Sequence, residues 1–108
     1  MGVDLNLMIF DNLKRSFPDW TLKLDADPEL FSDIENNLDS VRILDEIGMY
    51  SDDGLYWTLE DSYGTELMMI DSRVLATKMM QHDLSPVNNA IRLFLEVMPE
   101  KKVVLYWK

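Results

Sequence analysis

Three strand-like segments follow one another between residues 41 and 70, and only short turn sequences separate them. They cover residues 41–50, 55–60 and 65–70. Strands that run together, instead of alternating with helices, are typical of α+β proteins with an antiparallel sheet. The chain has 108 residues and no internal repeat, linker or low-complexity segment, so we expect one domain over residues 1–108.

Helix signals lie on either side of these strands. Asp27 and Ser85 each precede a proline that can begin a helix, and apolar residues then recur at helical spacing. These patterns predict helices over residues 27–38 and 85–98, and residues 71–82 fit a third. Leu95 lies on the clearest apolar stripe, whereas Glu35 is expected to face water.

Residues 4–17 fit two patterns. Alternating apolar residues at the start of this segment indicate a strand, while a spacing of four residues indicates a helix: Leu5, Ile9, Leu13 and Phe17. We favour the helix, and the strand stays open. With short strands at residues 20–24 and 103–107, the expected order is α-β-α-β-β-β-α-α-β. The fold class is therefore α+β, with a mainly antiparallel sheet of about five strands packed with three to four helices.

The negative charge is concentrated in one part of the chain. The net charge is −10, yet residues 25–71 hold fourteen acids and a single base, Arg42. A field this one-sided repels nucleic acid and anionic membranes and attracts cationic surfaces. We therefore expect a basic protein surface as the partner, with neither nucleic acid nor membrane bound directly. The alternative is that the acids serve only to keep the protein in solution.

The segment YSDDGLYWTLEDSYG, residues 50–64, combines acids with aromatic rings. A three-residue loop over 52–54 would place Met49 opposite Trp57 and Glu46 opposite Glu60. Trp57 would then lie in the core, with the tyrosines and acids on an outer face suited to an interface. The predicted partner-binding residues are Glu46, Tyr50, Asp52, Asp53, Tyr56, Glu60, Asp61 and Tyr63.

Signals for enzymatic chemistry are weak. The chain has no cysteine and one histidine, His82, at a predicted helix end, and it lacks glycine-rich phosphate loops. A magnesium site from Asp45, Asp61 and Asp71 is conceivable but unspecific. We therefore predict no catalytic residue, no metal and no cofactor. The methionine pairs at 68–69 and 79–80 are expected to place one member of each pair in the core.

The first eleven residues, MGVDLNLMIFD, resemble the opening of some small bacteriocin immunity proteins. In composition the chain also resembles small acidic phage inhibitors, including anti-CRISPR and DNA-mimic proteins. These features predict a non-enzymatic inhibitor or immunity-type protein that occludes a basic, nucleic-acid-binding surface. The absence of cysteine fits the cytoplasm, or the host cytoplasm for a phage protein. The alternative is an assembly module of a viral or secretion machine that binds through a methionine-rich patch or a sheet edge.

Overall fold

The centre of the fold is a pair of antiparallel strands, β1 (Leu5–Phe10) and β7 (Lys102–Trp107). The computed structural model describes residues 3–108 and, except at Ser51, their side chains. Three further strands complete a five-stranded antiparallel sheet of order β2-β1-β7-β6-β3, namely β2 (Trp20–Leu24), β6 (Met68–Asp71) and β3 (Val41–Arg42). The predicted α+β class with a mainly antiparallel sheet is confirmed.

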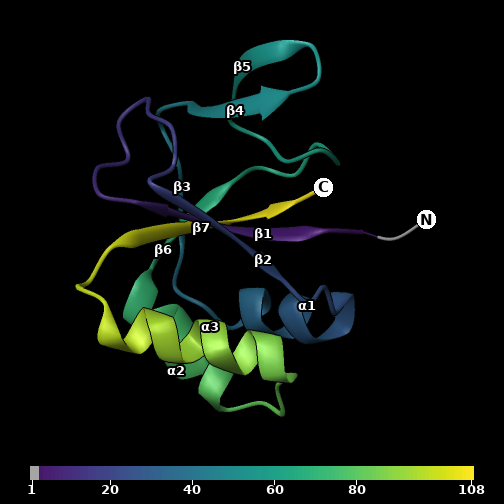
Figure 1. Ribbon diagram of the computed structural model, residues 1–108, viewed down its shortest axis with the longest axis vertical. Coiled ribbons are helices and arrows are strands. Elements are labelled where there is room, and N and C mark those ends of the chain that lie inside the picture. The colour runs from purple at the N-terminus through teal and green to yellow at the C-terminus, as the bar shows by residue number, and fades with distance from the viewer. Residues whose placement is uncertain (1–2) are drawn as a thin grey trace.

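Different layers cover the two faces of this sheet. Three helices lie on one face, α1 (Pro28–Asn36), α2 (Ser72–Met80) and α3 (Pro86–Val97). The other face carries a hairpin of β4 (Ile47–Ser51) and β5 (Gly54–Thr58), so the sheet is the middle of three layers (Figure 1). Among the residues that the structure describes, no helix has the length and apolar character needed to cross a membrane.

The helix predicted for residues 4–17 is wrong, because β1 occupies its first part and an irregular loop follows. Leu5, Leu7 and Ile9 pack with the helices, whereas Met8 and Phe10 pack with the hairpin layer. A strand buried on both faces is apolar almost throughout, and its sequence then also fits a helical spacing. The strand alternative for this segment was therefore the correct one.

Both predicted helix starts are confirmed. The Asp27 carboxylate accepts a hydrogen bond of 3.1 Å from the backbone N–H of Leu30, and the Ser85 hydroxyl accepts one of 3.2 Å from Asn88. The buried Asn88 side chain also forms two hydrogen bonds with the backbone of Asp25. This pair ties α3 to the connection that leads into α1, and so helps to fix the position of α1.

The predicted inner faces of α2 and α3 are only partly correct. Leu75, Met79 and Leu95 are buried, but Val74 is exposed. The predicted α3 face also included residues that are exposed in the structure, namely Val87, Ala90 and Phe94. The apolar arc of α3 is therefore wider than the part that the sheet and α2 cover. Met79 is buried and Met80 exposed, as predicted for one methionine pair, whereas Met68 and Met69 are both only partly buried.

The hairpin has a different register from the predicted one. Ser51 pairs with Gly54 across a two-residue turn, so Gly48 lies opposite Trp57 and Met49 opposite Tyr56. The segment predicted as one strand over 41–50 is also divided into β3 and β4. A shift of one residue turns every side chain of β5 to the other face. Trp57 consequently faces outward, and Tyr56 faces the main sheet.

Leu95→Ala is expected to lower the free energy of unfolding by about 2–5 kcal/mol, because it leaves a cavity in a tightly packed core. The Leu95 side chain is 0% exposed. Val97→Ala on the same helix is the control, since Val97 is 81% exposed. Denaturant unfolding measures both variants, and equal midpoints for the two would contradict the assigned face of α3.

Candidate functional site

The tip of the β4–β5 hairpin presents two carboxylates and one aromatic ring to solvent. Asp52 and Asp53 form the turn, and both are exposed. The Tyr50 side chain is 74% exposed, although one side of its ring stacks on Phe17 with 5.0 Å between the ring centroids. Three of the predicted partner-binding residues therefore lie together at an accessible tip.

The loop over residues 11–19 covers the outer face of the hairpin. The Arg15 guanidinium lies 4.0 Å from the centre of the Trp57 ring, and its Nε is 3.7 Å from a carboxylate oxygen of Glu46. The Phe17 ring lies so close to Gly48 that an added Cβ would be 2.6 Å away from it. This loop explains why Trp57 is half-buried outside the two main cores. It also means that Glu46 already has a cationic partner.

Tyr56 lies on the inner face of the hairpin, contrary to the prediction. Its hydroxyl shares a hydrogen bond of 3.1 Å with that of the buried Tyr106. This hydrogen bond, together with burial, raises the pKa of Tyr56 to about 12. The Tyr56 ring stays partly exposed and lines a hollow of about 360 Å³ with Tyr50 and Asp52.

The predicted pairing of Glu46 with Glu60 is also wrong. Glu60 forms an antiparallel bridge with Glu66 instead, through the segment that follows β5. Glu66 is 3.2 Å from the guanidinium of Arg42, so only Glu60 of this pair keeps an uncompensated charge. The two-residue turn is the cause, because it shifts β5 relative to β4 by one position.

Asp61 organises the loop that follows. Its side chain is 9% exposed, and one carboxylate oxygen accepts backbone N–H bonds from Tyr63 at 2.9 Å and from Thr65 at 3.0 Å. The Tyr63 side chain is 60% exposed, and its hydroxyl donates to the backbone carbonyl of Lys108 at 3.2 Å. This loop is therefore held in a defined shape, with Asp61 inside it and Tyr63 outside.

A cleft lies between this loop, α1 and the end of β7. We name it the α1 cleft and define it by Glu35, Asp61, Tyr63, Thr65 and Trp107. Its outer part has a volume of about 400 Å³, and an inner part of about 100 Å³ shares four of these residues. The Phe31 ring meets the Trp107 ring edge-on at 6.4 Å and so supports one wall of the cleft.

Glu35 is a site residue that the sequence analysis assigned to the solvent. Burial raises its pKa; a hydrogen bond to the Trp107 side chain acts in the opposite direction, and the negative charge of Asp61 adds to the rise. One signal was present, since Glu35 lies four residues after Phe31 and therefore on the apolar side of α1. No local pattern indicated Trp107 as a neighbour.

The carboxylates do not form a metal site. Within residues 3–108, no group of three or more histidine, aspartate or glutamate side chains could hold a metal ion. Asp71 forms an ion pair with Lys102 instead of meeting Asp61. His82 lies just after α2, and its Nε2 is 3.6 Å from a carboxylate oxygen of Asp33 on α1.

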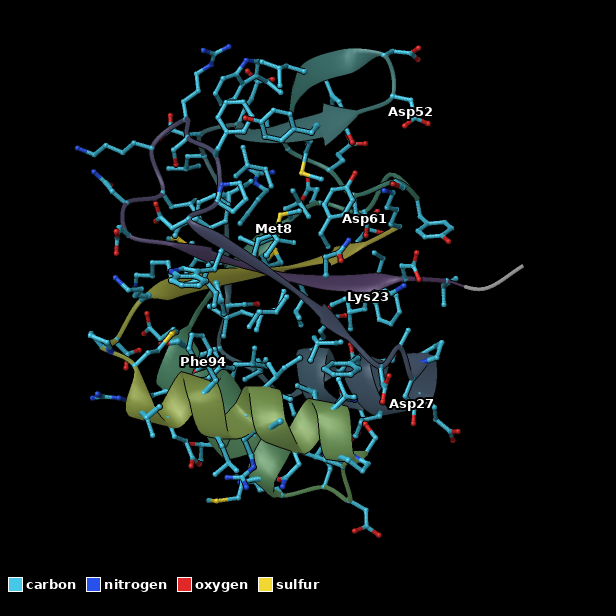
Figure 2. The ribbon with its side chains drawn as sticks, viewed as in Figure 1. Met8, Lys23, Asp27, Asp52, Asp61 and Phe94 are labelled. Carbon is cyan, nitrogen blue, oxygen red and sulfur yellow. The ribbon has the colours of Figure 1, made fainter. Side chains whose placement is uncertain are left out.

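Five carboxylates on one side of the molecule have no cationic partner among the described residues: Glu35, Asp52, Asp53, Glu60 and Asp61. We call this set the acidic side. Figure 2 shows Asp52 and Asp61 on the right of the molecule, with Lys23 and then Asp27, the N-cap of α1, below them. Comparison with protein-family models, with curated proteins and with solved structures found no match to this chain.

Glu35→Gln is expected to stabilise the protein at neutral pH. The folded protein holds a proton on Glu35 more tightly than the unfolded chain does, whose pKa is the ordinary 4.5. Folding therefore loses stability as pH rises from that value through the raised pKa of Glu35. Gln removes this loss, so thermal melts should show a gain at pH 7 that shrinks in acid.

Glu29→Gln, on the exposed first turn of α1, is the control and should show no such gain. A Glu35→Gln variant with an unchanged or lower melting temperature at pH 7 would show that the cleft does not disfavour the Glu35 charge.

Proposed function

We propose that this protein is a non-enzymatic inhibitor that places its acidic side on a basic surface of another protein and occludes that surface. The observation that carries the proposal is that the five carboxylates of the acidic side lack cationic partners among the described residues. Elsewhere among the described residues, Asp4, Glu96 and Glu100 are paired with a base, whereas Asp39, Asp45 and Asp83 also lack an ion pair. The acidic side differs from these single acids because Asp52 and Asp53, and likewise Glu60 and Asp61, are adjacent pairs, and solubility alone does not require such a concentration.

The shape of the acidic side suits a surface that binds nucleic acid. The molecule measures 36 Å along its longest axis, which is vertical in Figure 1. Figure 2 shows Asp52 at the top of that side and Asp61 below it, with Lys23 lower still. One turn of duplex DNA has a length of about 34 Å, so the longest axis of the protein is close to the length of a groove built for one turn of phosphates. A nuclease or other nucleic-acid-binding protein is therefore the proposed partner, as for an anti-CRISPR, DNA-mimic or toxin-neutralising protein.

The proposed mechanism separates two roles. Asp52, Asp53 and Glu60 are exposed, so they act on the rate of association through the summed field. Tyr50 and Tyr63 add aromatic contact area beside these acids, and such contacts slow dissociation. The absence of cysteine is compatible with action in the cytoplasm.

One observation favours a second candidate, an assembly module. Leu93, Phe94 and Val97 of α3 are exposed, and the Phe94 ring meets that of Trp20 at 6.2 Å. Trp20 belongs to β2, which is an edge strand of the sheet. An apolar face beside an open sheet edge is a common binding surface. Salt distinguishes the two candidates, because apolar contacts do not weaken as the ionic strength rises.

Replacing Asp52 and Asp53 with Asn should reduce recovery of the basic partner from a lysate of the native host. It should also slow association with the purified partner, most clearly at about 0.1 M salt, where the Debye length is about 10 Å. Surface-binding kinetics at about 0.1 M and about 1 M salt measure this effect.

The matched control is Glu96→Gln with Glu100→Gln, which removes the same charge from the far end of α3 and the residues that follow it. Glu100 is in an exposed ion pair with Arg73, and Glu96 is in a helical pair with Arg92 four residues earlier; pairs of these two kinds contribute little to stability. Equal association rates for the two double variants would contradict steering by the hairpin tip.

A further inference from the structure

The α1 cleft is lined by a buried residue, Asp61, that has one carboxylate oxygen without a hydrogen-bond partner among the described residues. Asp61 is more than nine-tenths buried, and one of its oxygens accepts the two backbone N–H bonds of the loop. Its other oxygen accepts no hydrogen bond from the described residues. Among those residues, every fully buried side-chain N or O atom has a hydrogen-bond partner. The second Asp61 oxygen has none, so it is not fully buried and is open to the cleft. It is the acceptor that a ligand in the cleft would meet.

The cleft also lacks a positive charge of its own. Glu35 and Asp61 line both its outer and its inner part, and Glu66 joins them in the inner part. Lysine and arginine are absent from both linings, and Arg42 is bound to Glu66 of the inner part. Burial removes water from Glu35 and makes its negative charge unfavourable. A cation in the cleft would stabilise that charge in place of the lost water.

The walls suit a flat, weakly hydrated cation. Trp107 and Tyr63 line the outer part of the cleft, and the edge of Phe31 holds the Trp107 ring in place. A guanidinium stacks on aromatic faces and donates paired hydrogen bonds to carboxylates, whereas an ammonium is compact and strongly hydrated. Two carboxylates beside an aromatic wall therefore favour arginine over lysine.

We propose that the α1 cleft binds the guanidinium group of an arginine side chain that projects from the basic partner. This inference rests on the proposed function and gives its docking surface a central anchor. Asp61 accepts from the guanidinium through its free oxygen, Glu35 accepts from it across the cleft, and the ring of Trp107 covers its face. The exposed acids of the hairpin tip then surround this anchor.

Capped arginine, N-acetyl-arginine methylamide, tests the anchor without any partner protein. The indole N–H signal of Trp107, identified among the three tryptophans by Trp107→Phe, is followed by NMR during titration. The expected result is a saturable shift of that signal. Glu35→Gln should weaken binding about ten-fold or more, as expected for losing a charge-assisted hydrogen bond. Capped lysine should bind more weakly than capped arginine.

Glu96→Gln with Glu100→Gln, which removes negative charge from residues that do not line the cleft, is the matched control, and this double variant should bind capped arginine as the wild type does. Asp61→Asn keeps one oxygen for the loop hydrogen bonds, and it too should bind capped arginine more weakly. The absence of a saturable shift, or equal affinity in wild type and Glu35→Gln, would overturn the anchor. Equal affinity for capped lysine would overturn the choice of a guanidinium.

These outcomes are distinct from those of the proposed function. Partner binding that depends on Asp52 and Asp53, with no capped arginine bound, would retain the inhibitor and remove the anchor. Binding of capped arginine with no effect of Asp52 and Asp53 on partner association would support the anchor and contradict steering.

Discussion

The burial of β1 and β7 on both faces is the constraint on which the rest of the structure depends. Leu5, Leu7 and Ile9 need the helices on one side, and Met8 and Phe10 need the hairpin layer on the other. Because apolar burial is the main favourable term in folding, neither layer is an optional addition. The pairing of β1 with β7 also places Lys108 beside Asp4, and the end of β7 lies against the loop that holds Asp61.

The cleft is a consequence of this arrangement. Trp107 is the last residue of β7, and its backbone carbonyl accepts the N–H of Ser62 at 3.1 Å. The same strand end lies against Phe31 of α1. Glu35 and Asp61 are thereby brought together in the cleft, where burial and the charge of Asp61 raise the pKa of Glu35. An unfavourable charge of this kind, within a fold whose other interactions agree with one another, is typical of functional sites.

Features set by neighbouring residues, such as helix caps, were predictable from the sequence. Features set by contacts between distant segments were not. Asp27 and Ser85 cap their helices as expected, because a cap and its proline act within one turn. The helix predicted over β1 and the hairpin register both failed because distant segments decide them. Packing on both faces makes β1 a strand, and Phe17 with Arg15 gives Trp57 a cover outside the main core. Asp52, Asp53, Asp61 and Tyr63 were predicted as site residues from composition, whereas Glu35 and Trp107 required the topology.

The central claim is that the acidic side, and not α3, meets the partner. Chemical labelling of carboxyl groups, read by mass spectrometry in the free protein and in the complex, tests it most directly. Asp52, Asp53 and Glu60 are exposed, as are Glu96 and Glu100, so all five react in the free protein. The account predicts that the first three become protected in the complex while Glu96 and Glu100 react as before. Protection of Glu96 and Glu100 with full reaction at the hairpin tip would contradict it.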